Sequence, residues 1–285
     1  ANFADFANIS LSGKMSTVGF GSIDKSPNQR SREEIKQYGL LSSINIGQLL
    51  PKKWEIQIPV SYSISEEFST PEYDPFFQDI KLEDRLNSAD TQQDKESIKN
   101  QAISYRKISS INLLGVKKNR SEEQKERVYD IENFDFSYSY NQELQHDYEI
   151  ENLTKKTARV SSAYNYTFNP FVISPFKKIK FLENNNYLEW LKEFNFNPLL
   201  SSLSFDANIN RAFNSQQFRD VFVEGADMSD QIALPEIQQR HFLFDWNLSL
   251  SQNLSNSLRI DFSASNNSIV KNYFKTDVLG NKTVD

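Results

Sequence analysis

The residues of this sequence that could do chemistry are two histidines and several groups of acidic side chains. His146 and His241 are isolated, and no His-x-x-x-His spacing occurs, which argues against a histidine metal site. The acids between 220 and 230 could hold calcium, but their spacing lacks the regular EF-hand loop. The pairs Glu66–Glu67 and Glu122–Glu123 come with no pocket signal. We expect all of these to be solvated loop or strand-end residues.

Catalytic and nucleotide-binding signatures are absent from the sequence. The sequence has 0 cysteines, which excludes disulfides, thiol nucleophiles and cysteine-zinc sites. No Gly-x-Ser-x-Gly, phosphate-loop or dinucleotide-binding glycine pattern occurs, and the two glycines of Gly19–Gly21 are too few to indicate phosphate binding. The sequence therefore predicts a chain that is not an enzyme and that uses no cofactor and no metal.

Composition narrows the class of protein further. The net charge of -6 at pH 7 argues against a general nucleic-acid or anionic-membrane binder, so we expect no nucleic-acid partner. No stretch approaches the roughly 18 uncharged apolar residues of a membrane-spanning helix. A transmembrane β-barrel stays possible, because its strands are only half apolar. The 22 Phe, 12 Tyr and 3 Trp fit the aromatic girdles of such a barrel.

The strongest pattern is the strict alternation of apolar and polar residues between 54 and 64. Successive strand side chains point to opposite faces, so this pattern predicts one long strand with an apolar face. Ten steps of about 3.3 Å, tilted by about 40°, span about 25 Å, the height of a barrel's apolar band. Pro59 cannot donate a ladder hydrogen bond, so we expect a bulge or break beside it.

Eight further stretches alternate in the same way, near 7–15, 38–46, 103–113, 134–141, 160–168, 203–213, 242–251 and 258–265. The apolar residues that we expect to face lipid are Trp54, Ile56, Ile58, Val60, Tyr62, Ile64, Phe134, Phe136, Tyr138, Phe205, Ile209, Phe244, Trp246, Leu248, Ile260 and Phe262. The polar residues that we expect to face a wet lumen are Glu55, Gln57, Asp135, Arg159, Asp206, Asp245, Asn247, Arg259 and Asp261. A soluble sandwich could also expose such a polar face to water, so the faces alone do not separate the two folds.

The connections between these stretches predict a sidedness. In an up-and-down barrel, alternate connections lie at the same end. The tight turns 48–53 and 252–257 fall at one end, and the long connections 19–36, 66–100 and 214–239 fall at the other. Bacterial barrels have this asymmetry, with short periplasmic turns and longer outer loops.

Two connections depart from the asymmetry. The segment 114–131 is dense in charge, so we expect a solvated connection. In the segment 170–200, apolar residues recur at helical spacing from Tyr187 to Phe194, which predicts a short helix in a periplasmic or lumenal insert.

These patterns together predict an all-β chain, an antiparallel up-and-down transmembrane β-barrel segment. We expect residues 1–285 to be part of one barrel domain. Nine strands are an odd number with loose ends, so we expect the remaining strands of the same barrel to lie elsewhere.

Six groups of residues, spread over most of the chain, carry a resemblance to a known family. They are 11–22, 50–54 with 56–59, 70–80, 132–140, 194–198 and 216–219, which include Leu-Ser-Gly-Lys-Met from Leu11 and Thr-Pro-Glu-Tyr-Asp-Pro from Thr70. In these stretches the chain resembles the SprA/Sov family, the giant outer-membrane translocons of the type 9 secretion system in Bacteroidetes. Family members are several times longer, so the resemblance implies one part of a larger barrel.

The resemblance also implies a function. Such a barrel encloses a pore that passes folded cargo proteins with type 9 C-terminal signals from periplasm to cell surface, including gliding adhesins. Its implied partners are outer-membrane lipid, the PorV shuttle protein, a plug protein, periplasmic or lipoprotein accessories and the secreted cargo. The alternatives are another large outer-membrane barrel, for lipopolysaccharide assembly or nutrient uptake, and a soluble β-sandwich surface adhesin.

Overall fold

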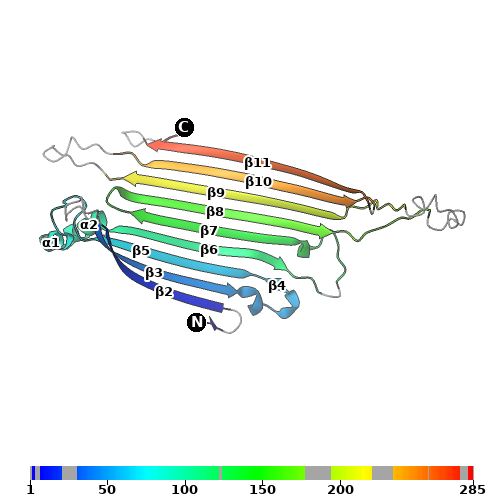
Figure 1. Ribbon diagram of the computed structural model, residues 1–285, viewed down its shortest axis with the longest axis horizontal. Helices are drawn as coiled ribbons and strands as arrows, with labels where there is room; N and C mark the ends of the chain where they lie inside the picture. The colour runs from blue at the N-terminus through cyan, green and yellow to red at the C-terminus, as the bar shows by residue number, and fades with distance from the viewer. Residues whose placement is uncertain are drawn as a thin grey trace.

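The computed structural model describes residues 2–3, 7–20, 31–121, 124–176, 194–219, 234–255, 257–276 and 282–284. The chain folds into one antiparallel sheet in which the long strands are neighbours in chain order (Figure 1). Its long strands are β2 (Ala7–Phe20), β3 (Ser31–Asn45), β5 (Pro59–Pro71), β6 (Ser104–Lys118), β7 (Phe134–His146), β8 (Ile150–Thr167), β9 (Ser202–Phe218), β10 (Ile237–Asn253) and β11 (Arg259–Thr276). The predicted all-β, up-and-down arrangement is therefore confirmed, and each of the predicted strands has its counterpart among these nine.

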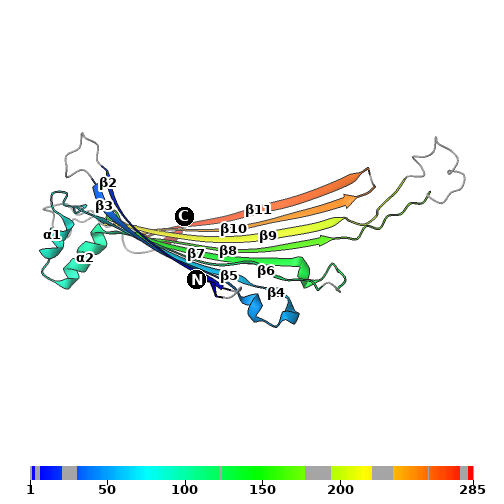
Figure 2. The same ribbon diagram turned by 60° about the horizontal axis from the view of Figure 1, so that its bottom comes forward.

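Shorter elements complete the fold. On their outer sides, the two outermost long strands pair only with very short ones within the described residues, β2 with β1 (Asn2–Phe3) and β11 with β12 (Lys282–Val284). Two α-helices, α1 (Leu82–Asn87) and α2 (Gln92–Ala102), lie at one end of the sheet beyond β5 and β6 (Figures 1 and 2). The other end carries the single turns η3 (Ile46–Leu49), η4 (Lys52–Trp54) and η5 (Ile131–Asn133), with the two-residue strand β4 (Ile56–Gln57).

The sheet is a single twisted layer. In the view of Figure 2 the strands fan out side by side, and the two helices sit at their ends instead of against a face. Within the described residues, the buried apolar side chains are Leu82, Ala102 and Leu153. Two of these belong to the helices, so the described part of the chain forms no conventional core between two layers.

Strand register places the alternating residues on common faces. Residues directly opposite each other in an antiparallel pair project on the same side of the sheet. A row of paired residues can therefore be followed across seven strands: Ile44, Val60, Leu113, Tyr138, Val160, Ile209 and Phe244. Apolar residues of separate stretches thus form one continuous surface, although they are far apart in sequence.

A bulge keeps β6 in this pattern. The pairing of β6 with β7 shifts register between Leu113 and Val116, and Gly115 there has a φ of 72°. This left-handed conformation is open to glycine at little cost. The Gly115 amide donates to Ser137 Oγ at 2.9 Å, and both Leu113 and Val116 then pair with residues of the same face. The bulge explains why the alternation of 103–113 does not simply continue.

The predicted strand from 54 to 64 is wrong in its first half. Trp54 ends η4, and Glu55 takes a left-handed conformation that separates it from β4. The short β4 pairs with β6, and the regular strand β5 starts only at Pro59. Because proline lacks an amide donor, the first position of a strand suits it. The break expected beside Pro59 is therefore confirmed, and it falls at Ile58.

Other strands are longer than the alternation predicts. The residues 66–71 are the second half of β5, and 142–159 belong mostly to β7 and β8. Large apolar residues stand singly in these parts, at Phe68, Leu144, Ile150 and Leu153, so the sequence shows no period of two there. The turn 147–149 is tight because Asp147 Oδ1 accepts from the amides of Glu149 at 2.9 Å and Ile150 at 2.8 Å.

The predicted sidedness is only partly correct. The tight turn 147–149 lies at the same end as the helices, where long connections were expected, and the long connection 168–201 lies at the opposite end. The predicted turn 252–257 is confirmed as a short connection, whereas 46–58 contains η3, η4 and β4. The predicted helix from Tyr187 lies outside the described residues except for Phe194, as do the acids between 220 and 230.

Candidate functional site

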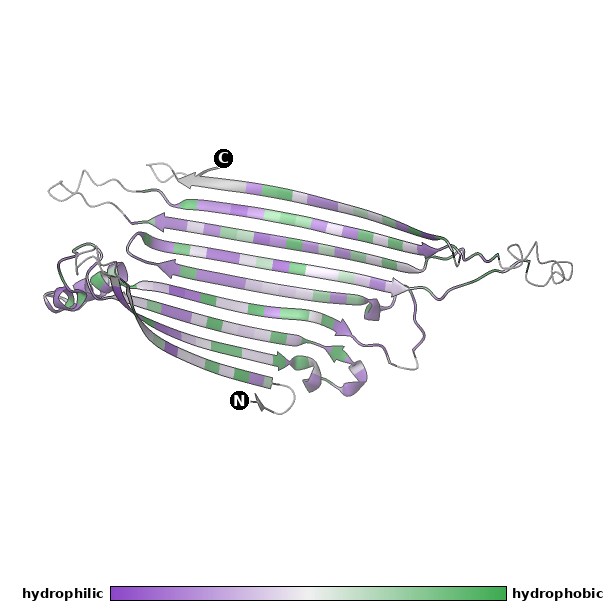
Figure 3. Cartoon of the chain, in the orientation of Figure 1, coloured by the Kyte–Doolittle hydropathy of each residue, from purple (hydrophilic) through white to green (hydrophobic). Residues whose placement is uncertain are grey.

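One face of the sheet carries an uncovered band of apolar side chains, here called the apolar face. Thirteen of the residues predicted to face lipid share it by register: Val60, Tyr62, Ile64, Phe134, Phe136, Tyr138, Phe205, Ile209, Phe244, Trp246, Leu248, Ile260 and Phe262. Phe136 is 43% exposed, Phe205 39% and Phe262 54%. Green and purple segments alternate along the strands in Figure 3, as expected of a sheet with one apolar and one polar face.

Three of the predicted lipid-facing residues are not part of this ladder. Trp54 lies in η4, Ile56 lies in β4, and Ile58 links β4 to β5. The Ile58 carbonyl accepts from the Ile46 amide at 2.9 Å, which closes the connection between β3 and β5. These residues therefore belong to the turn region at the end of the apolar band.

The band has a definite height. On β9 it runs from Leu203 to Ile209, and on β10 from Phe242 to Leu250. These six and eight residue steps, at about 3.3 Å each, correspond to about 20–26 Å along the strands. With strands tilted by about 40°, this length corresponds to a height of about 15–20 Å, which is somewhat less than the apolar band of about 25 Å on outer-membrane barrels.

The band ends in a row of polar and charged residues on the side nearest α1 and α2. We call this row the charged rim: Lys36, Glu66, Lys107, Gln142, Lys156, Arg211 and Arg240. Within it, Lys107 Nζ and Glu66 Oε1 form an ion pair at 2.9 Å. The sequence analysis missed the rim, because only the strand register shows that these residues continue the apolar face.

The opposite face, here called the polar face, carries seven of the residues predicted to face a lumen: Asp135, Arg159, Asp206, Asp245, Asn247, Arg259 and Asp261. Asn208 Nδ2 donates to Asp245 Oδ2 at 2.9 Å, and Arg259 Nε donates to Asp261 Oδ1 at 2.9 Å. The other two, Glu55 and Gln57, lie with η4 and β4 outside the long strands.

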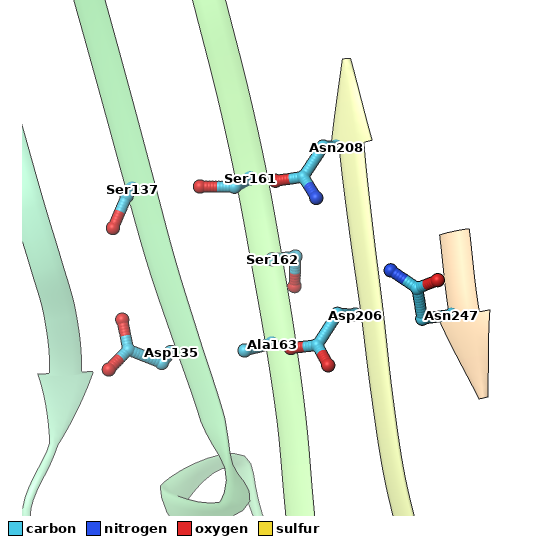
Figure 4. A pocket seen from close by; sticks show the side chains of 8 residues that line it. All are labelled: Asp135, Ser137, Ser161, Ser162, Ala163, Asp206, Asn208 and Asn247. Carbon is cyan, nitrogen blue, oxygen red and sulfur yellow. The ribbon is translucent and has the colours of Figure 1, made fainter. Parts of the chain in front are cut away.

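Part of the polar face forms a shallow depression over β7, β8, β9 and β10 (Figure 4). The carboxylates of Asp135 and Asp206 lie in it with the amides of Asn208 and Asn247 and the hydroxyl of Ser137. Among the described residues, no group of His, Cys, Asp and Glu could hold a metal ion. The depression offers carboxylate, amide and hydroxyl groups for hydration and hydrogen bonding.

A cluster at the helical end ties three connections together. Asp74 is 0% exposed, pairs with Arg85 of α1, and accepts from the amides of Phe76 at 2.8 Å and Phe77 at 3.1 Å. Arg219 donates to the backbone carbonyls of Asp147 at 2.7 Å and Asn100 at 2.6 Å. Burial lowers the pKa of Arg219. The helices are thereby attached to the β7–β8 turn and to the end of β9.

A second cluster lies at the opposite end and corrects the expectation of a merely solvated connection at 114–131. Lys118 Nζ donates to Glu132 Oε1 at 2.6 Å, and the Glu132 side chain is only 4% exposed. This hydrogen bond lowers the pKa of Glu132. Arg120 donates to Asn133 at 2.8 Å and pairs with Asp130 at 3.4 Å, so the charged residues bind one another.

A known family model matches the first part of the chain. Residues 1–86 match the family model SprA_N, described as a motility related/secretion protein. This match supports the interpretation of the chain as a fragment of a SprA-family protein. The matched segment contains β2, β3, β5 and most of α1, so the family match covers the first long strands of the sheet and their apolar face. No curated protein matches the chain.

The two α-helices, α1 and α2, are short. None of the helices in the described parts of the chain is long and apolar enough to cross a membrane.

Proposed function

We propose that this sheet is part of the barrel of a protein-conducting outer-membrane pore. The observation that carries the proposal is a single layer of nine long, sequentially paired strands with one apolar and one polar face, both uncovered within the described residues. The family match to motility and secretion proteins supports the same role.

The apolar face needs a partner as extensive as itself. Leaving a large apolar side chain in water costs about 1.5–3 kcal/mol relative to burial, and exposed apolar side chains occur on every long strand except β8. A soluble sandwich covers such a face with a second sheet, which the described residues do not contain. Membrane lipid covers such a face in a barrel.

The polar face suits the lining of a wide pore. Beside its carboxylates and amides it carries many short hydroxyl side chains, such as Ser137, Ser161 and Ser249. These groups keep water bound and offer little apolar surface to which an unrelated protein could adhere. A folded cargo protein can pass such a surface without being held.

The edges of the sheet are suited to pairing with further strands, as the resemblance to a larger barrel implies. Long strands with unpaired backbone groups invite further pairing, so β2 and β11 are the places where the remaining strands of the barrel attach. We place the protein in the outer membrane of a Bacteroidetes bacterium, where it exports cargo with type 9 C-terminal signals, gliding adhesins among them. The PorV shuttle protein, a plug protein and periplasmic or lipoprotein accessories complete the assembly, and the chain has no enzymatic role.

A cross-linking experiment tests this proposal. The sequence has 0 cysteines, so single cysteines can be introduced into this segment of the complete protein without local background. Ser137→Cys and Ser161→Cys should cross-link to cargo stalled during export, whereas Phe136→Cys should not. Equal cross-linking from both faces, or none from the polar face, would reject the pore. Recovery of the complete protein without detergent in the soluble fraction would reject the membrane location.

A further inference from the structure

Three cations lie together in the charged rim, on the apolar face of β8, β9 and β10. Lys156 and Arg240 are both register partners of Phe213, one on each side of it. Arg211 is two residues from Phe213 on the same strand and therefore on the same face. The Arg240 guanidinium lies 5.3 Å from the centre of the Phe213 ring. With neighbouring strands about 4.8 Å apart, the three cations occupy one small patch around this ring.

Two of these cations, Lys156 and Arg211, differ in their ion pairing from the cations at the same level of the polar face. On the polar face, Arg106 and Lys155 both bind the carboxylate of Glu143, at 2.8 Å and 3.7 Å. Lys156 and Arg211 have no ion pair within the described residues, and the side chain that faces Lys156 from β7 is the uncharged Gln142. Arg211 is exposed and Lys156 half-buried. Two cations without an ion pair in the described part of the chain, Lys156 and Arg211, thus lie directly above an apolar surface.

We propose that Lys156, Arg211 and Arg240 bind the phosphate groups of a membrane lipid, an inference that rests on the proposed function. A lipid at the edge of the apolar band meets the cations with its phosphate groups and the apolar surface with its acyl chains. Lysine and arginine bind phosphate oxygens by charge-assisted hydrogen bonds. Their aliphatic stems and the Phe213 ring cover the adjoining apolar surface.

The occupant is the phosphorylated headgroup of lipopolysaccharide, the lipid of the outer leaflet. On the rim side, the strands continue well past the band, to His146 on β7 and to Phe218 on β9, and the helices follow. At the opposite end the band reaches almost to the strand ends, at Leu203 and Leu250. We assign the rim to the outer leaflet because strands that continue beyond the apolar band suit the outer side of a barrel, although the long connections 119–133 and 168–201 lie at the opposite end.

Lipid retention by the complete protein tests this inference. The protein and its variants are purified in detergent and titrated with lipopolysaccharide, with phosphatidylglycerol micelles as a second probe. Removing two basic residues, at about 1 kcal/mol each, should weaken lipopolysaccharide binding about thirtyfold in the double variant K156Q/R211Q. The matched control K155Q/R106Q removes the same charge at the same level of the other face and should bind as the unmodified protein does.

Each outcome of this experiment is decisive. Equal binding by the double variant and its control overturns the inference, as does stronger binding of phosphatidylglycerol than of lipopolysaccharide. Should K156Q/R211Q fail to assemble, Arg211→Lys, which keeps the charge, must bind normally and Lys156→Gln alone must bind severalfold more weakly. A protein that inserts into the membrane yet ignores lipopolysaccharide refutes this inference alone, whereas a protein that does not insert refutes the proposed function.

Discussion

Replacing Leu248 by arginine tests the lipid-facing side of β10. Leu248 lies between Phe205 of β9 and Ala264 of β11 on the apolar face, one step of the face from Trp246 at the middle of the band. An arginine at the midplane of an outer-membrane barrel costs about 2–4 kcal/mol, and less toward its edges. We therefore expect Leu248→Arg to destabilise the inserted protein by about 2–3 kcal/mol, about 30- to 150-fold in the folding equilibrium.

The neighbouring residue supplies the control for this prediction. Asn247 lies on the same strand at nearly the same depth but on the polar face, so Asn247→Arg adds the same side chain to a wet surface. Such surface substitutions change stability by about 0.5 kcal/mol or less. The assay is the urea concentration at which the complete, detergent-purified protein loses its heat-modifiable folded form. Equal sensitivity of the two variants would refute the assignment of the faces.

Three further predictions concern the elements that shape the sheet. Gly115→Ala should destabilise the protein by about 1–2 kcal/mol, because the residue has a left-handed conformation, and thermal unfolding measures this. Asp74→Ala should leave Arg85 without its buried partner, at a cost of about 3–5 kcal/mol, and limited proteolysis should then cut at 82–102 while the strands stay intact. The lowered pKa of Glu132 means that its contact with Lys118 stabilises the connection 119–133 above the ordinary glutamate pKa. That stability is lost as the pH falls through the lowered pKa, so hydrogen exchange there should rise in acid, and Glu132→Gln should abolish the pH dependence.

The sequence was informative wherever one face of a strand is apolar. Around Phe134–Tyr140 and Phe242–Leu250 one face is apolar and the other polar, so the sequence alternates. The strands β7 and β10 lie where this alternation predicts them. Where both faces are polar, as on β8 from Thr154 to Thr157, alternation carries no signal, so the strand ends were missed. The period-two rule thus detects the apolar band instead of the strand itself.

Features that depend on contacts across strands could not be read from the sequence. The left-handed Glu55 interrupts a stretch whose alternation is otherwise perfect, and nothing local distinguishes it. Likewise, the cations of the charged rim stand in separate segments, and only the register of β8, β9 and β10 brings Lys156, Arg211 and Arg240 around one ring. Pro59 was the exception, because its missing amide donor made a local break predictable.

The central claim is that the two faces of this sheet meet different solvents. Spin labels at single cysteines along β10, from Phe242 to Leu250 in the complete membrane-embedded protein, measure this directly through their collisions with oxygen and with a water-soluble nickel complex. We predict that oxygen accessibility peaks at the even positions and nickel accessibility at the odd ones. A profile without this period of two, or with the two reagents exchanged, would contradict the account.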